Sequence, residues 1–469
     1  MKHKTTKKVT PKRAKVRLGK HLEQINLYAA GIDVGAFNHY VAVPEGLDDQ
    51  TVRTFACFTA DLNQMADWLV RIGIQTVVME STGVYWIPVF EILEERGLQV
   101  LLVNARHVKN VAGRKSDVLD CQWLQQLHTY GLLEGAFRPP EQVCALRAYL
   151  RQRETLIRYA SSHTQHMQKA LRQMNLLLDN VVSDITGKTG MQIIRAILAG
   201  ERDAHKLAQY RDHRCKRSVE TIAKSLEGHY REEHLFALSQ AVELYDIYQE
   251  KLRACDLAIE QQLDTFDAQA DPAHLPAPAK HRYKRGNALA FDVRTQLYRI
   301  TGVDLTRIDG IDETTALKFL AETGTDMSRW KTEKHFASWL GLSPGNKISG
   351  GKVLNSKTKP SANRAAAALR MAAFTLSNSK SALGAFYRRQ RTRLGAPKAI
   401  TATAHKLARL IYSMLKHGTE YVDRGQEYYE QQYRERVINN LRRRAAQFGF
   451  ELAINPQEQE PMTPGAVVS

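Results

Sequence analysis

The order of strand-like and helix-like segments in residues 28–133 is the feature that most restricts how this chain can fold. Short β-rich runs with turn residues between them come first, and they predict three strands. Helical spacing then alternates with two apolar strand-like runs, and the segment closes with a helical pattern at residues 115–133. The sequence therefore predicts three antiparallel strands that continue into parallel β-α units.

Four acidic side chains stand at the ends of these predicted elements. Asp33 lies near the end of the first strand and Glu80 ends the fourth, while Asp117 and Asp120 lie three residues apart in the last helix. The order of elements is that of a ribonuclease H-like fold, in which adjacent parallel strand ends meet and the last helix can lie across them. The four carboxylates would then converge, although no single segment contains more than two.

Converging carboxylates repel one another unless a cation lies between them. Hard divalent cations with oxygen ligands neutralise such a cluster, and Mg²⁺ is the ion we expect. Two such ions about 4 Å apart can clamp the attacking and leaving oxygens of an in-line phosphoryl displacement. The pattern therefore predicts a two-metal site that acts on phosphodiesters.

Each acid also has an ordinary explanation. A strand-end Asp or Glu is commonly a turn or cap residue, and Asp117 with Asp120 can form a solvated helix face near a helix N-terminus. The stretch GIDVG also resembles the first phosphate loop of actin-type and Hsp70-type ATPases. That fold needs a second Gly-rich phosphate loop after another Asp-bearing strand, and the sequence has none in a suitable place.

The positive charge of the chain is unevenly distributed. Its 469 residues carry a formal net charge of +18. Residues 1–20 hold nine Lys or Arg, and residues 334–419 hold sixteen, without one Asp or Glu in either range. Because folded surfaces usually mix charge signs, the second range predicts a polyanionic partner, most simply nucleic acid. Chance clustering and an acidic protein partner are the alternatives.

Cysteine usage and hydropathy indicate the cellular setting. The five cysteines have no CxxC spacing, which argues against a disulfide framework and against a zinc site. No window approaches the roughly 18 consecutive apolar residues of a membrane helix, and the basic N-terminus lacks the apolar segment of a secretory signal. We expect a soluble protein in a reducing cytoplasm, with no membrane partner.

The remainder of the chain is predominantly helical. A heptad register starting at Val143 predicts a coiled-coil or bundle helix, and a second helical pattern at residues 234–266 could return antiparallel to it. Residues 305–324 resemble a helix-hairpin-helix, whose turn amides can hold a phosphate, although Asp312 replaces an expected glycine and a plain helical hairpin is the alternative. All but two of the eleven a and d positions, Arg153 and Thr164, are apolar; the eleven are Val143, Leu146, Leu150, Arg153, Ile157, Ala160, Thr164, Met167, Leu171, Met174 and Leu178.

These patterns divide the chain into six predicted regions. They are a disordered basic arm (1–27), an α/β domain with the acids (28–139), a helical coiled-coil arm (140–265), a linker or insertion (266–300), a mainly α C-terminal domain (301–425) and a helical then disordered tail (426–469).

Specific stretches resemble a known family. GIDVGAFNHYVAV, FASWLGLSPGNKISGGKV and residues 77–133 and 183–203 are similar to insertion-sequence transposases and Piv-type DNA invertases. Members of that family have an N-terminal DEDD, RuvC-like domain and a C-terminal serine transposase domain. The resemblance places the DEDD tetrad on the four acids named above and a serine nucleophile on Ser349. It also implies donor and target DNA, and a structured bridge RNA that guides the choice of both.

The chemistry around Ser349 is consistent with that role. A serine hydroxyl that attacks phosphorus forms a phosphoserine bond, which conserves the energy needed for religation. Gly350 and Gly351 would let the backbone approach a phosphate closely, and Lys347, Lys352 and Arg364 could neutralise its oxygens. By itself SGGK is only a flexible basic turn, and spacing does not exclude three nearby serines, Ser343, Ser356 and Ser361.

The resulting expectation is an Mg²⁺-dependent DNA transposase or site-specific recombinase. Because recombination requires several strand cuts, we expect a dimer or tetramer, in which the acids of one subunit can face the serine of another. The resemblance implies a prokaryotic, nucleoid-associated protein. Two alternatives stay open: a RuvC-like junction-resolving nuclease that uses water, and a non-catalytic nucleic-acid-binding protein.

Overall fold

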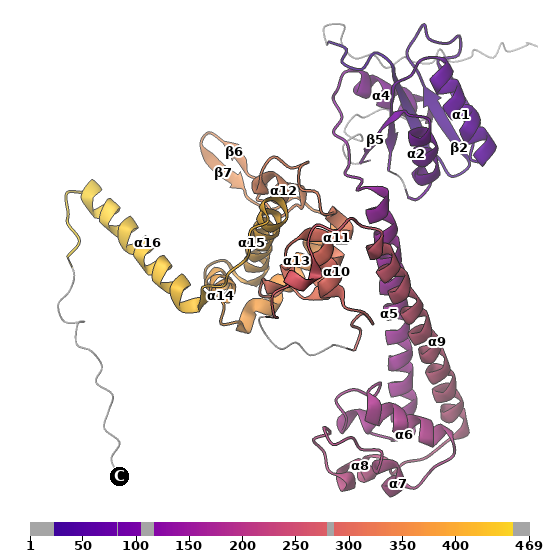
Figure 1. Ribbon diagram of the computed structural model, residues 1–469, viewed down its shortest axis with the longest axis vertical. Coiled ribbons are helices and arrows are strands. Elements are labelled where there is room, and N and C mark those ends of the chain that lie inside the picture. Colours follow the sequence, from indigo (N-terminus) through magenta and orange to yellow (C-terminus); the bar gives the residue numbers. More distant parts are fainter. Residues whose placement is uncertain (1–22, 82, 105–116, 279–285, 454–469) are drawn as a thin grey trace, which may run out of the picture. The chain divides into compact units, whose positions relative to one another are not determined.

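The computed structural model describes residues 23–81, 83–104, 117–278 and 286–453. The chain divides into two compact units, Met1–Arg138 and Pro139–Ser469, which are considered separately (Figure 1). The predicted arm at residues 1–27 and the end of the predicted tail lie largely outside the described residues. Within the described residues, no helix has both the length and the apolar character needed to cross a membrane.

A five-stranded mixed sheet forms the centre of the first unit. Its order is β3-β2-β1-β4-β5; β1 pairs antiparallel with β2, as β2 does with β3, whereas β1 pairs parallel with β4 and β4 with β5. The predicted sequence of strands and helices is confirmed. The strands are β1 Ala29–Val34, β2 Asn38–Ala42, β3 Val52–Ala56, β4 Thr76–Glu80 and β5 Gln99–Val103.

Each face of this sheet has its own core. Helices α1 (Thr59–Arg71) and α2 (Trp86–Glu95) cover one face, where β4 contributes Val77 and Met79. Helix α4 (Asp117–Thr129) covers the other, where Val78 of β4 packs with Trp123 and Leu124 of the helix. Alternation of side chains along β4 explains the division, because neighbouring residues point to opposite faces.

Two long helices open the second unit. α5 (Glu141–Gln173) and α9 (Glu232–Asp264) run antiparallel, since Gln142 near the start of α5 donates to the carbonyl of Thr265 after the end of α9, at 3.3 Å. A buried ion pair between Arg153 and Asp256 joins them further along. Of the eleven predicted heptad positions, Ile157 and Thr164 are half-buried and the others are buried, the last two beyond the end of α5.

A small helical cap connects the two long helices. It has its own core, to which Met167 and Leu171 of α5 and Leu238 of α9 contribute. The cap comprises η1 Leu178–Asn180, α6 Lys188–Leu198, α7 Ala204–Ala208 and α8 Val219–Ser225.

The rest of the second unit is helical apart from one hairpin. Its elements are η2 Pro272–His274, α10 Val293–Thr301, η3 Leu305–Arg307, α11 Glu313–Thr323, α12 Glu333–Trp339, β6 Lys347–Ser349, β7 Lys352–Asn355, α13 Arg364–Thr375, η4 Leu376–Asn378, α14 Ala382–Leu394, α15 Ala396–His417 and α16 Gly425–Gln447. The five cysteines, all described, carry free thiols.

The structure adds detail to two local predictions in this unit, the linker and the helix-hairpin-helix. The predicted linker at 266–300 is partly helical, because Asp292 caps α10 by accepting from the Thr295 amide and Gly302 ends it in the left-handed region. In the predicted helix-hairpin-helix, Asp312 caps α11 by accepting from the Thr315 amide at 2.8 Å. That bond explains the aspartate, and it occupies an amide that a phosphate would need.

Candidate functional site

Strand register places two of the four acids side by side. Ile32 of β1 is level with Met79 of β4, so Asp33 and Glu80 follow at the same level of adjacent parallel strands. Glu80 points to the same face as Val78, which is the face that α4 covers. The strand ends therefore present two carboxylates to one helix.

A glycine sets how closely that helix approaches. A Cβ at Gly31 would lie 2.4 Å from the amide nitrogen of Gln125 and 2.5 Å from the carbonyl oxygen of Cys121. These are backbone atoms of α4, so β1 and α4 touch without side chains between them. Asp33 lies two residues further along the same face of β1, towards the first turn of α4. The glycine inside a strand was the sequence signal for this close contact.

The first turn of α4 supplies the other two acids, Asp117 and Asp120. Acidic residues are favourable there because the amides of a helix N-terminus carry partial positive charge. Burial raises the pKa of Asp33 to about 6, and the negative charges of Asp117, Asp120 and Glu80 add to the shift. The fold therefore brings the other three predicted acids within electrostatic range of Asp33.

The donor set suits a divalent cation chemically. Its members offer only carboxylate oxygens, the ligands that Mg²⁺ prefers, and a cation would relieve the repulsion that raises the pKa of Asp33. Within residues 23–81, 83–104, 117–278 and 286–453, no group of three or more His, Cys, Asp or Glu side chains is arranged to hold a metal ion. The acids are gathered, but their side chains do not form a closed coordination shell.

Two buried residues of α4 near the site, Cys121 and His128, were not predicted from the sequence. Burial raises the pKa of the Cys121 thiol to about 12, and the charges of Asp33 and Asp120 contribute, so this thiol stays protonated. His128, in the last turn, lies 2.9 Å from the hydroxyl of Thr76 at the start of β4, and burial lowers its pKa to about 4. A neutral His128 thus ties the far end of α4 to the sheet.

Ser349 lies in the hairpin of β6 and β7, opposite Lys352. Gly350 and Gly351 form the turn with φ angles of 54° and 76°, a left-handed pair that hairpin turns build mainly from glycine and asparagine. Lys347 begins the first strand, and the whole hairpin is exposed. Lys347, Gly350, Gly351 and Lys352 therefore belong to the same hairpin as Ser349.

Arg364 is placed differently. It is the first residue of α13, and its guanidinium pairs with Glu154 of α5 at 3.1 Å. Among the alternative serines, Ser361 accepts a hydrogen bond from the Asn363 amide and packs against Gly341. Ser343 precedes the hairpin and Ser356 follows it. The four acids belong to the first unit and Ser349 belongs to the second.

Two stretches of the chain match known protein families. Residues 30–176 match the model of a transposase family, that of the IS110-type DEDD transposases, and residues 304–388 match the Transposase IS116/IS110/IS902 family. No curated protein matches the chain. The fold and the two matches support a DNA transposase or recombinase.

More narrowly, the matches support a transposase of the IS110 type. The DEDD match implies a ribonuclease H-like fold for the α/β domain and a dependence on a divalent metal, for which Mg²⁺ is typical. Transposases act on DNA, so the two matches imply a DNA substrate.

Proposed function

We propose that this protein cuts and rejoins DNA by transesterification, with Ser349 as the nucleophile and Asp33, Glu80, Asp117 and Asp120 as Mg²⁺ ligands. Asp33 and Glu80 lie at the ends of adjacent parallel strands on the sheet face that α4 covers, and the first turn of α4 carries Asp117 and Asp120; this convergence is the observation that supports the metal assignment. The three other carboxylates also help to raise the pKa of Asp33. Mg²⁺, when bound, supplies positive charge to the oxygens of a scissile phosphate.

The exposure and the charge of the hairpin support Ser349 as the nucleophile. The Ser349 hydroxyl is exposed beside Lys347 and Lys352, whose charges can offset those of an incoming phosphate. In the first step the serine oxygen bonds to phosphorus, its proton is lost to solvent, and the P–O bond to one deoxyribose breaks and leaves a protonated hydroxyl. A hydroxyl of another DNA end then attacks the phosphoserine, which restores the serine and joins the strands.

The proposal includes partners that follow from the family resemblance. A structured guide RNA would select donor and target DNA by base pairing, as in other RNA-guided systems. Because the acids and Ser349 belong to separate units, a dimer or tetramer can combine the acids of one subunit with the serine of another. The long pair α5 and α9 is the element we propose for subunit contact.

The decisive experiment traps the covalent intermediate. The protein is incubated with Mg²⁺, its guide RNA and radiolabelled donor DNA, and adducts are resolved on a denaturing gel. Ser349→Ala should abolish the adduct while nucleic-acid binding persists, whereas the matched control Ser356→Ala should keep it. An adduct that survives in Ser349→Ala would identify another nucleophile.

The products separate the remaining alternatives. Free 5′-phosphate ends without joined strands would support a nuclease that uses water. DNA that stays intact with saturating Mg²⁺ and the correct RNA would support a non-catalytic nucleic-acid-binding protein.

A further inference from the structure

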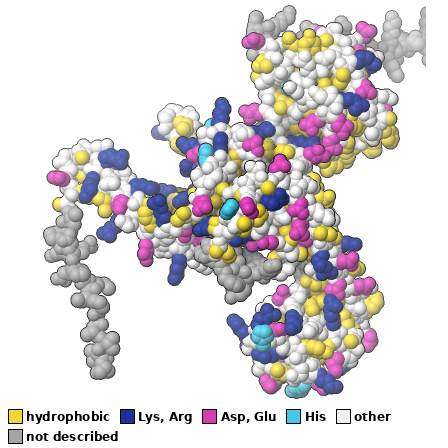
Figure 2. All heavy atoms as spheres, viewed as in Figure 1, with side chains coloured by type: hydrophobic (Ala, Val, Ile, Leu, Met, Phe, Trp, Pro, Cys, Tyr) yellow, Lys and Arg dark blue, Asp and Glu magenta, His cyan; other side chains and the backbone are white. Residues whose placement is uncertain are grey.

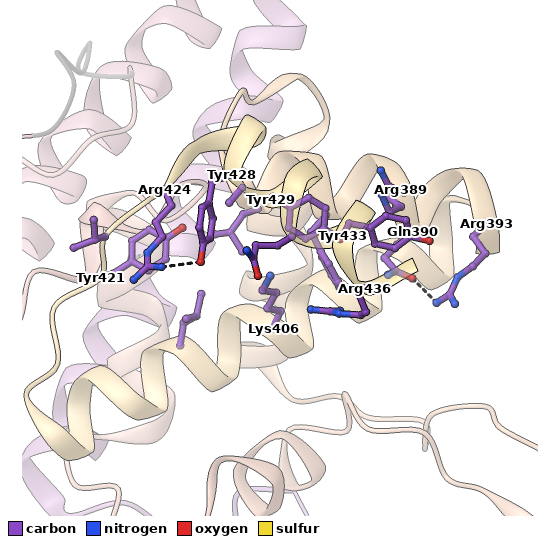
Figure 3. A pocket seen from close by; sticks show the side chains of 16 residues that line it. Arg389, Gln390, Arg393, Lys406, Tyr421, Arg424, Tyr428, Tyr429, Tyr433 and Arg436 are labelled. Carbon is purple, nitrogen blue, oxygen red and sulfur yellow. Dashed lines mark hydrogen bonds between the residues drawn. The ribbon is translucent and has the colours of Figure 1, made fainter. Parts of the chain in front are cut away.

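A groove of about 590 Å³ lies between α14, α15, α16 and the segment that precedes α16 (Figure 3). Among the described residues that line it, five are Lys or Arg, four are tyrosines and one is a phenylalanine, and none is Asp or Glu. Figure 2 shows Lys and Arg side chains along α14 and α16. The groove is distinct from both the four acids and the Ser349 hairpin.

Positive charge is concentrated at the base of the groove. The Lys406 ammonium lies 4.5 Å from the ring centroid of Phe386 and 5.5 Å from that of Tyr429. Burial lowers the pKa of Lys406, and the positive charges of Arg436 and Arg409 lower it further. A bound anion would relieve this crowding of like charges.

Aromatic faces flank these charges. The Arg389 guanidinium lies 3.5 Å from the ring centroid of Tyr433 and is also paired with Glu430. Arg424 lies 5.0 Å from the ring centroid of Tyr428 and donates to its hydroxyl at 2.7 Å. The tyrosines are thus held in place by guanidinium groups, which limits the entropy lost when a ligand binds.

Helix α16 packs against the rest of the second unit mainly through side chains at the groove. All of α16 is described, and none of its side chains is buried. It contacts α14 through the rings of Phe386 and Tyr429 and through the bond from Arg388 to Gln426 at 2.7 Å. A helix with so little core is held chiefly by the polar and aromatic groups that line the groove.

We propose that this groove binds a single-stranded segment of nucleic acid, whose unpaired bases stack on the tyrosines while Lys406, Arg389 and Arg436 hold its phosphates. Alternating aromatic and cationic side chains are what a strand with exposed bases and charged phosphates requires. A duplex offers the phosphates but hides the base faces, and an acidic peptide offers carboxylates without rings to stack. The inference goes beyond the proposed function, since it needs neither metal nor Ser349.

Binding can be measured apart from catalysis. Full-length protein carrying Ser349→Ala, which prevents covalent capture, is titrated into fluorescein-labelled pyrimidine RNA, DNA of the same sequence, and a blunt DNA duplex, with fluorescence anisotropy as the signal. We expect Tyr428→Ala to weaken single-stranded binding roughly tenfold and to leave duplex binding unchanged, because one stacked base is lost. Tyr428→Phe should retain the affinity, and Tyr210→Ala, an exposed tyrosine of the cap, should have no effect.

Salt dependence tests the phosphate contact. Arg436→Gln should weaken single-stranded binding and reduce the slope of log affinity against log salt by about 0.7. The RNA and DNA arms show which strand the groove accepts, and preferential binding of either one supports the proposal. Unchanged single-stranded affinity in Tyr428→Ala and Arg436→Gln would overturn it, as would equal losses of affinity for the duplex and for the single strands. Since no arm requires cleavage, an inactive protein that still binds would refute only the proposed function.

Discussion

The site of the four acids and the Ser349 hairpin differ in what holds them in place. The acids lie on a sheet and a helix whose backbones touch at Gly31, with packed cores on both sheet faces. The hairpin exposes its apolar residues, Ile348 at 63%, Val353 at 58% and Leu354 at 70%. An isolated two-stranded hairpin is marginally stable in water. We infer that the acids are positioned by folding, whereas the hairpin is positioned by what it binds.

The largest expected effect follows from filling the contact at Gly31. Gly31→Val places side-chain atoms where the backbone of α4 lies, at 2.4 and 2.5 Å from the new Cβ, so the helix must move. We expect the first unit to lose about 3 kcal/mol of stability, at the upper end of overpacking effects. Urea unfolding of the full chain measures this loss.

Gly286→Val is the matched control, because nothing lies within 4 Å of a Cβ there. It should leave the urea midpoint unchanged. A stable Gly31→Val protein with normal activity would show that the acids are not positioned by this contact.

A smaller effect is expected from the charge of Asp33. Its pKa is raised to about 6 in the folded protein from 3.8, so the unfolded chain loses this proton first as the pH rises. Without metal, stability should therefore fall between about pH 4 and pH 6 and then level off. Asp33→Asn should remove this fall, and its gain above pH 6 should be on the order of 1 kcal/mol once solvent screening is allowed for.

Thermal unfolding with and without Mg²⁺ tests whether the Asp33 carboxylate helps to bind the ion. Mg²⁺ should raise the Tm of the natural protein and have a smaller effect on Asp33→Asn. An equal rise in both proteins would place the ion elsewhere.

The smallest effect on stability is expected in the hairpin. Gly350→Val forces a β-branched residue to a φ near 54°, which costs roughly 1–2 kcal/mol locally. Because the hairpin contributes little to any core, the free energy of unfolding of the whole protein, measured with urea, should change by less than about 0.5 kcal/mol, while the adduct yield falls. Gly350→Asn should preserve both quantities, since asparagine tolerates this conformation. A large loss of global stability in Gly350→Val would show that the hairpin, like the site of the four acids, is held by the folded core.

Sequence alone predicted the order of strands and helices around the four acids better than the contacts of the second unit, for a physical reason. Periodicity fixes strands and helices locally, and parallel strands put Asp33 and Glu80 at one edge once their order is known. The partner of Arg364 could not be found in this way, because Glu154 is 210 residues away. The distance between α4 and β1 depends on a single backbone contact, for which Gly31 was only a weak signal.

The groove between α14 and α16 could not be predicted from the sequence either. Its tyrosines and arginines come from helices that meet through contacts such as Arg389 with Glu430, 41 residues apart. The acid-free range predicted a polyanion, but composition cannot show which basic side chains face the same cavity as aromatic rings. That arrangement exists only after α16 folds against α14.

The bare contact at Gly31 has a mechanical consequence. Two peptide backbones in direct contact determine the spacing between β1, which carries Asp33, and α4, which carries Asp117 and Asp120. Residues in the surrounding cores can therefore change size or rotamer with little respacing of the acids. Only a shift of the whole helix alters the distance between these two backbones, so Asp117 and Asp120 move towards or away from Asp33 together.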